Sequence, residues 1–265
     1  MDYGNEWVLL KSLLRGIKPL RKVRDLSTMK NEVLKTKKEH TQKILRVLAR
    51  TYPHAKIALR FSHHWELLVA VILSAQCTDK KVNEVTERLF KKYKTRDDYV
   101  RAPLSEFEAM IRSTGFYHAK AKNIIAAATL IKEKFGGSVP RTMEEILMLP
   151  GVARKTANVV LGNAFGIVEG IAVDTHVRRL SQRLGFSKFQ NPEKIEKDLM
   201  ENLPKKDWFR ATSLLVDHGR AICTAKDPRC DLCPLAKLCP SAFQFPRFAA
   251  HAALPSRKKD NRPTA

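Results

Sequence analysis

The lysine at position 155 and the aspartate at position 174 are the side chains of this sequence best placed to do covalent chemistry. Lys155 opens an apolar stretch of helical periodicity, directly after a turn at Pro150-Gly151. Asp174 precedes another such stretch, where its carboxylate can cap the first turn of a helix. An amine attacks carbon only without its proton, so a nucleophilic lysine needs burial, a nearby cation or a proton-accepting carboxylate. Arg154 supplies the cation, and Asp174 supplies the carboxylate if the two helices pack side by side.

The segment around Lys155 also predicts a helical hairpin that binds an anion. A short helix over residues 143–149 is followed by the turn and by a second helix whose first turn carries cations, where acidic residues are usual. Backbone N–H groups at the start of this second helix have no helical partner, which suits a phosphate. They belong to Gly151, Val152, Ala153 and Arg154. On spacing alone a second interpretation stays open, in which Lys155 only binds phosphate and Asp174 only caps a helix.

Four of the five cysteines crowd near the end of the chain, spaced Cys223-x6-Cys230-x2-Cys233-x5-Cys239. Four thiolates this close can surround one metal centre, and both zinc and a [4Fe–4S] cluster use four cysteines. An odd total with tight clustering is unlike a secreted disulfide framework, so the sequence favours a reducing, intracellular compartment. The fifth cysteine, Cys77, stands in an apolar stretch and is expected to be a buried small residue.

The net charge of the chain indicates which class of molecule it binds. The chain has 265 residues and a formal net charge of +22, with 29% charged and 44% hydrophobic residues. This imbalance predicts a polyanionic partner, nucleic acid first and an anionic membrane surface second. The longest apolar run, Leu67–Leu73, is far shorter than the ~18–20 residues of a membrane span. We therefore expect no insertion into a membrane.

Helical periodicity recurs from Lys38 onward without convincing alternation of period two, so the predicted fold class is all-α. Thr78 or Asp79 is expected to cap a helix. Residues 1–36 read as a flexible basic extension that contacts DNA, unless translation starts at Met29. The segments expected to be helical include 65–75, 119–135, 175–185, 192–203 and 206–222, and residues 243–265 are expected to be a disordered tail.

The stretch LPGVARKTANVVLGNAFG, followed by VDTHV, resembles the helix-hairpin-helix and catalytic loop of the endonuclease III family of DNA glycosylases. The cysteine spacing is also that of this family. The resemblance implies two helical domains with a DNA-binding cleft between them. One is a barrel-like six-helix domain, residues 57–168, with the helix-hairpin-helix at about 142–165. The other is an iron–sulfur cluster domain formed by residues 37–56 and 169–242. A glycine is usual in the family where this chain has Ala153.

Activity is implied by the same resemblance. It predicts a bifunctional DNA glycosylase and AP lyase of base excision repair that excises oxidised pyrimidines. Lys155 attacks the sugar C1′ with the help of Asp174, and the cysteines hold a [4Fe–4S] cluster. The partner is double-stranded DNA with a damaged pyrimidine or an abasic site. We expect a monomer in the bacterial cytoplasm. A non-catalytic iron–sulfur DNA-binding protein and a mismatch-specific glycosylase of the same superfamily are the alternatives.

Further DNA contacts follow from positions that match the family. Gln76 and Phe116 match the residues that enter the opened duplex, His176 is placed near a phosphate, and Lys226 and Arg229 lie beside the cluster, where they can reach the backbone. Simpler interpretations stay open for three of them. Gln76 can be a helix cap, Phe116 a core residue and His176 a structural histidine.

Overall fold

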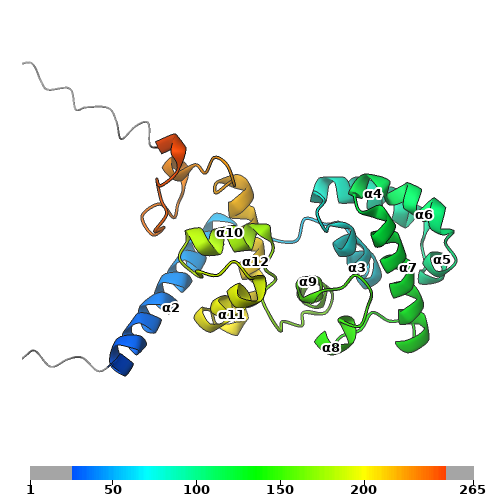
Figure 1. The fold of residues 1–265 in the computed structure, drawn as a ribbon, viewed down its shortest axis with the longest axis horizontal. Coiled ribbons are helices and arrows are strands. Elements are labelled where there is room, and N and C mark those ends of the chain that lie inside the picture. Colours follow the sequence, from blue (N-terminus) through cyan, green and yellow to red (C-terminus); the bar gives the residue numbers. More distant parts are fainter. Residues whose placement is uncertain (1–25, 249–265) are drawn as a thin grey trace, which may run out of the picture.

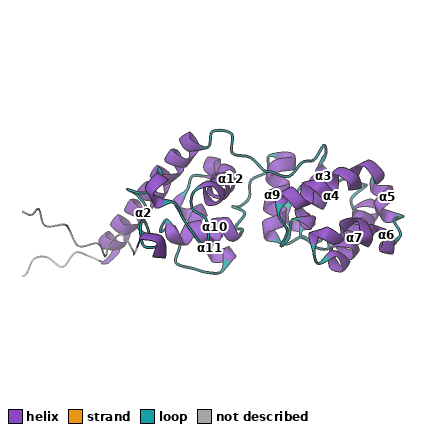
Figure 2. Cartoon of the chain, turned by 90° about the horizontal axis from the view of Figure 1, so that it is seen from above, coloured by secondary structure: helices purple, strands orange, loops and turns teal. Residues whose placement is uncertain are grey.

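The computed structural model describes residues 26–248, with side chains from residue 35 onward, and all regular structure within this part is helical. The helices form two lobes that lie side by side along the long axis of the molecule (Figure 1). Two linkers, residues 52–63 and 166–174, join them (Figure 2). None of the helices in the described part is both long enough and apolar enough to span a bilayer. The expected all-α class with two helical domains is confirmed.

The first lobe surrounds one apolar core. It consists of α3 (His64–Leu73), α4 (Asp79–Lys92), α5 (Arg96–Val100), α6 (Leu104–Ile111), the 3-10 turn η2 (Arg112–Thr114), α7 (Tyr117–Lys134), α8 (Met143–Ile146) and α9 (Arg154–Phe165). Helix α3 is apolar on nearly every side and runs through the middle of this core. Trp65 packs edge-on against Tyr99 with 5.1 Å between the ring centroids. The ring of Phe107 packs beside those of Tyr93 and Tyr99. The apolar face of α9 packs against this core, which fixes the position of the helix.

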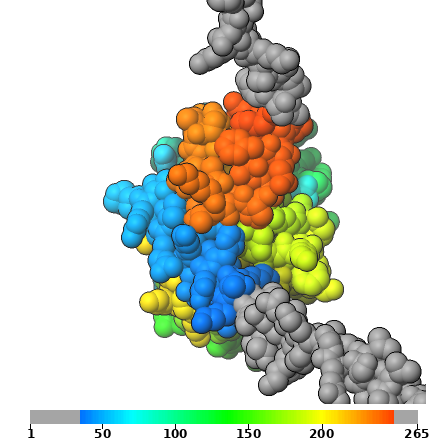
Figure 3. All heavy atoms as spheres, turned by 90° about the vertical axis from the view of Figure 1, so that its left-hand side faces the viewer, coloured from blue at the N-terminus to red at the C-terminus, as the bar shows by residue number. Residues whose placement is uncertain are grey.

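The second lobe combines segments from both ends of the described chain. It consists of α2 (Leu26–Thr51), α10 (Thr175–Arg183), α11 (Pro192–Asn202), α12 (Lys205–Ala221) and the 3-10 turn η3 (Cys230–Leu232). Ile44 and Leu48 of α2 pack with Leu180, Phe186 and Leu215 in a core of its own. The cysteine segment lies against α2 on the outer face of the lobe, orange beside blue in Figure 3.

Helix starts follow the expected local chemistry. Thr78 caps α4 by accepting a hydrogen bond from the N–H of Lys81, and Asp174 caps α10. The short helix α5 was not expected from the sequence. A capping box between Thr95 and Asp98 forms it, in which each side chain accepts from the backbone N–H of the other.

Both predicted tails differ from expectation where the structure describes them. Residues 26–36, placed in the flexible extension, are helical and continue α2, because that stretch has no glycine or proline to interrupt the helix. The rest of the extension, including the amphipathic stretch at residues 8–17, lies outside the described residues. At the other end, residues 243–248 fold onto the cysteine segment, and the Phe245 ring lies 4.5 Å from the guanidinium of Arg183. Residues 249–265 lie outside the described part.

Candidate functional site

The turn before α9 depends on a glycine. Gly151 has φ +80°, and a Cβ at this position would come within 3.0 Å of the Asn123 side chain. A side chain here is strained and crowded, so the turn requires glycine. Val152 is buried and its N–H donates to the carbonyl of Leu149 at 3.1 Å, which closes the hairpin. The expected helical hairpin, α8–turn–α9, is therefore present.

Helix α9 begins with free backbone donors. Its N-cap residue, Ala153, provides no side-chain hydrogen bond, and the first turn contains no acidic residue. Ala153, Arg154 and Lys155 are all exposed. Unpaired N–H groups and the positive end of the helix dipole therefore face outward together. This arrangement suits the binding of a phosphate, as the sequence predicted.

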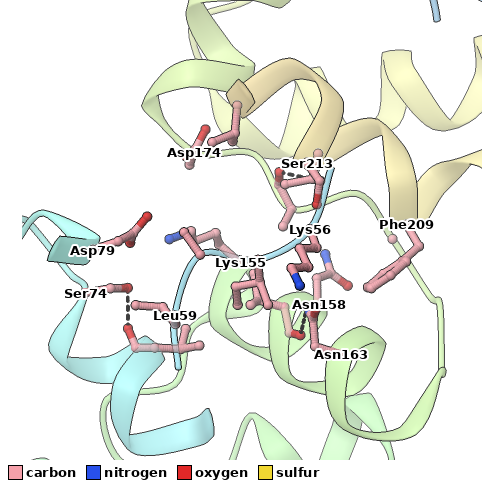
Figure 4. A pocket seen from close by; sticks show the side chains of 18 of the residues that line it. Lys56, Leu59, Ser74, Asp79, Lys155, Asn158, Asn163, Asp174, Phe209 and Ser213 are labelled. Atoms are coloured by element: carbon pink, nitrogen blue, oxygen red, sulfur yellow. Dashed lines mark hydrogen bonds between the residues drawn. The ribbon is translucent and has the colours of Figure 1, made fainter. Parts of the chain in front are cut away.

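Lys155 and Asp174 come from different lobes and line the same cleft (Figure 4). Asp174 is half-buried, and its Oδ1 accepts a hydrogen bond from the N–H of Val177 at 2.8 Å. Asp174 is therefore a helix cap, and its second carboxylate oxygen, Oδ2, remains available to accept a proton or a hydrogen bond. The described residues show no ion pair or hydrogen bond between Lys155 and Asp174, so the cleft brings them together without direct contact.

A second carboxylate in this cleft was not predicted as functional. Asp79, expected only as a possible cap, sits at the start of α4 and pairs with Arg220 of α12. This ion pair bridges the two lobes. Figure 4 shows Asp79 on the side toward which the Lys155 amine points. Nothing in the local sequence indicates the pair, because its members stand 141 residues apart.

His176 lines the same cleft with a defined hydrogen-bonding role. Its Nδ1 lies 3.2 Å from Nη2 of Arg179, which can only donate, so Nδ1 is the acceptor. Burial holds the pKa of His176 below its ordinary value, against a smaller opposing effect of Asp174. The imidazole is therefore neutral at pH 7, and its proton is on Nε2, which makes it a hydrogen-bond donor.

The side chain of Arg154 does not face the cleft. Its Nε donates to the buried carboxylate of Glu196 at 2.8 Å, and it lines a different hollow on the molecule. Glu196 also accepts from the amide of Asn158 and from the N–H of Ile171. This network fixes the start of α9 to α11 and to the linker between the lobes. The guanidinium is therefore paired with Glu196 and is not the free cation beside Lys155 that the sequence suggested, and a contact of Arg154 with DNA stays a prediction.

The two residues expected to enter the duplex share an unusual backbone. Gln76 has φ +53° and Phe116 has φ +49°, both in the left-handed region that non-glycine residues seldom adopt. Gln76 follows α3 and lines the cleft. The side chain of Phe116 is 65% exposed, so the core interpretation of this residue is wrong.

The four clustered cysteines line one cavity. In the part of the chain that the structure describes, no three cysteine, histidine or acidic side chains are close enough to hold a single metal ion. Four thiols around one cavity are the ligand set of a [4Fe–4S] cluster, in which each corner iron takes one thiolate.

Burial shapes the chemistry of this cavity. It raises the pKa of the Cys233 thiol to about 11 and also raises that of Cys239. The thiolates of Cys233 and Cys239 therefore need bound cations beside them, which the irons of a cluster would provide. Cys77, by contrast, lies in the cleft beside Gln76 and is only partly buried.

Arginines hold the cysteine segment in shape. Arg183 donates to the sulfur of Cys223 at 3.3 Å and to the carbonyl of Thr224 at 2.7 Å. Arg229, expected to contact DNA, donates to the carbonyl of Ala221 at 2.8 Å and so has a structural role as well. Lys226 is exposed on the same loop.

Known proteins share both parts of this arrangement. The profile of the HhH-GPD superfamily of base excision DNA repair proteins matches residues 69–205, and that of the iron-sulfur binding domain of endonuclease III matches residues 223–239. Endonuclease III of Synechocystis sp. is 52% identical over 207 residues, which cover 78% of this chain and 94% of the relative. The chain belongs to the endonuclease III family. Endonuclease III of Bacillus subtilis is 51% identical over 189 residues, which cover 71% of this chain and 86% of the relative.

Solved structures of the family agree. The chain resembles a trapped endonuclease III–DNA covalent intermediate, an estranged-adenine complex, and a non-covalent endonuclease III–DNA complex. Each matches with 45% identity and a TM-score of 0.75, over 78% of this chain and 97% of the other. This endonuclease III family member is therefore a DNA glycosylase and AP lyase of base excision repair. DNA is its partner, and its cofactor is the [4Fe–4S] cluster.

The residues that fit the cluster are Cys223, Cys230, Cys233 and Cys239. These four side chains would hold the cluster and so tie the loop directly after α12 to the rest of the C-terminal segment. The chain itself supplies the surrounding hydrogen bonds from Arg183. In this arrangement the cluster is a structural centre on the far side of α10 and α12 from the DNA-binding cleft.

Proposed function

We propose that this chain excises oxidised pyrimidines from duplex DNA and cleaves the strand, with Lys155 as the nucleophile. The observation that carries the proposal is the position of Lys155. It lies at the phosphate-binding start of α9, in a cleft that it shares with Asp174 from the other lobe. A nucleotide whose phosphate rests on the hairpin brings its sugar within reach of both side chains.

The reaction needs one amine and one carboxylate. The neutral amine of Lys155 attacks C1′, the bond from C1′ to the base breaks, and the base leaves with the electron pair and takes up a proton. The free oxygen of Asp174 accepts a proton from the amine and stabilises positive charge on the sugar. Ring opening gives a Schiff base between Lys155 and C1′. Loss of a proton from C2′ then expels the 3′ phosphate, and water releases the lysine.

Opening the duplex is assigned to two exposed residues. A base in the stack cannot reach the cleft, so the damaged nucleotide must leave the helix and its place must be filled. Phe116 offers an exposed ring for stacking, and Gln76 offers an amide for the edge of the unpaired base. Both side chains stand on strained backbone, a feature that recurs where function requires a fixed geometry.

Contacts to the DNA backbone come from the hairpin and its surroundings. We assign one phosphate to the N–H groups of Gly151, Ala153 and Arg154, and a second acceptor near the sugar to the Nε2–H of His176. The N–H of Val152, also expected to bind DNA, already donates to the carbonyl of Leu149 and is not free for this contact. Lys226 and Arg229 add positive charge on the cysteine loop. The expected domain division, with boundaries near residues 57 and 168, places this DNA path across both domains.

We also infer that the protein acts as a monomer in the bacterial cytoplasm, where its DNA substrate lies. Every proposed catalytic residue comes from one chain, and the endonuclease III relatives are bacterial proteins. Light scattering of the protein with and without a DNA duplex tests the first point. A dimer in solution that binds one duplex would contradict it.

Borohydride trapping tests the nucleophile. The wild-type chain should be fixed covalently to a duplex with an abasic site, and Lys155→Ala should not. Lys56→Ala is the matched control, because Lys56 is a second lysine that lines the same cavity (Figure 4). Trapping that survives in Lys155→Ala and disappears in Lys56→Ala would reassign the nucleophile. Duplexes with thymine glycol, uracil or a plain abasic site, scored separately for base release and nicking, test the preference for oxidised pyrimidines.

A further inference from the structure

Lys120 on α7 is a buried lysine without an acidic partner. Its side chain lies beneath the surface, with only 5% of the residue exposed. The ammonium group donates to two main-chain carbonyls, those of Leu73 and Thr114, each at 2.8 Å. No ion pair to Lys120 occurs among the residues whose side chains are described. A buried cation that is held only by carbonyls is costly, so its presence calls for a specific role.

The two carbonyls lie at equivalent places. Leu73 is the last residue of α3, and Thr114 is the last residue of η2. Carbonyls at the end of a helix lack intrahelical donors and carry partial negative charge. One ammonium group thus provides hydrogen bonds to the terminal carbonyls of two elements. These elements end at residues 73 and 114, which are 41 positions apart in the chain. The ammonium group fixes the distance between them.

Each of these ends leads directly to an exposed residue in the left-handed region. Gln76 stands in the loop of residues 74–78 after α3, and Phe116 stands in the turn of residues 115–116 after η2. We call these two segments the insertion loops. Such backbone persists only where the surrounding structure holds it, and the Lys120 side chain bonds to the residue directly before each loop.

We propose that Lys120 is a positioning residue that sets the spacing of the insertion loops, so that Gln76 and Phe116 enter the duplex together. The inference rests on the proposed function of these two residues. Lys120 itself is enclosed by protein and touches neither DNA nor the reacting atoms. Burial also lowers the pKa of Lys120 from its ordinary value, although the two carbonyls still accept hydrogen bonds from the amine.

The test compares Lys120→Met with the matched control Lys122→Met, which removes an exposed lysine from the same helix. The substrate is a duplex with an abasic site opposite 2-aminopurine, whose fluorescence rises when the partner base unstacks. We expect Lys120→Met to lower single-turnover nicking about tenfold and to suppress the fluorescence rise. Lys122→Met should change neither, and both variants should keep the visible absorption of the cluster.

A double-mutant cycle separates positioning from a purely structural role. In a Gln76→Ala/Phe116→Ala background, Lys120→Met should change the nicking rate by less than about twofold, because it acts through the residues already removed. An equal loss in both backgrounds, or no loss in either, would overturn the inference. If Lys120→Met does not fold, Lys120→Gln, which retains an N–H donor, replaces it in the same cycle. A Gln76→Ala/Phe116→Ala protein that nicks and unstacks like wild type would instead refute the proposed duplex-opening role itself.

Discussion

The two lobes are held together by different means. The first lobe has a large continuous core in which Trp65, Tyr93, Tyr99 and Phe107 pack ring against ring. The second has a smaller core, and much of the C-terminal segment that packs against it is not helical. Arginine side chains and four cysteines organise that segment instead. We therefore expect the first lobe to fold without the cofactor and the second lobe to depend more strongly on it.

The residues of the proposed site are also divided between the two lobes. The hairpin, Lys155 and the insertion loops belong to the first lobe, while Asp174 and His176 start a helix of the second. The proposed catalytic pair, Lys155 and Asp174, is therefore complete only when both lobes are folded and correctly placed. We therefore expect the cluster to affect activity without a part in bond breaking, because it would support the lobe that presents Asp174.

Loss of the cluster should have the largest effect. We expect Cys230→Ser to lose visible absorption and to expose α10–α12 to rapid hydrogen exchange, while α3 and α7 stay protected, because metal binding and folding are coupled in the second lobe only. Cys77→Ser is the matched control and should keep both properties. Exchange protection that is equal in the two lobes of Cys230→Ser would contradict the comparison.

A core substitution should act on the other lobe. Phe107 is fully buried among the aromatic rings, so Phe107→Ala should destabilise the first lobe by about 3–5 kcal/mol. Hydrogen-exchange protection of α3 and α7 in urea measures this loss. The visible absorption of the cluster should persist to a higher urea concentration than that protection. Phe189→Ala, at a phenylalanine that is 44% exposed, is the control and should cost less than about 1 kcal/mol. Simultaneous loss of both signals would mean that the lobes unfold as one unit.

Replacement of Asp174 by asparagine should separate catalysis from stability. Asparagine caps helices as well as aspartate does, so Asp174→Asn should leave the melting temperature nearly unchanged. It removes the carboxylate charge, and we expect base release to fall by about a hundredfold or more. Single-turnover kinetics beside a thermal melt checks both. Asp174→Ala should lose the cap as well, so a stable Asp174→Ala protein would show that capping contributes little.

Local spacing explains why much of this site was predictable from the sequence. The turn at Gly151, the exposed start of α9, the cap at Asp174 and the four cysteines all depend on residues within about a helical turn or one loop of each other. Contacts between distant segments carry no such signal. Lys120 meets Leu73 across 47 residues, which no periodicity reveals.

Arg154 is a case in which a contact between distant segments made a prediction from local sequence wrong. The helix-start pattern predicted a cation that faces outward, and the backbone obeys it. The side chain instead turns to the buried Glu196, 42 residues away. The prediction of the helix start was thus correct, but a tertiary ion pair with Glu196 determines where the Arg154 side chain points.

The smallest effect is expected at the ion pair that joins the lobes. Asp79 and Arg220 have side chains that are 25% and 44% exposed, so water and salt screen their attraction. A double-mutant cycle of Asp79→Asn and Arg220→Gln should give a coupling free energy of about 0.2–1 kcal/mol that falls as salt is added. The pair Lys132–Asp97, which lies within the first lobe, is the matched control and should behave alike. A coupling above about 2 kcal/mol would mean that the pair is desolvated and that the interface between the lobes, not only the cluster, holds Asp174 in place.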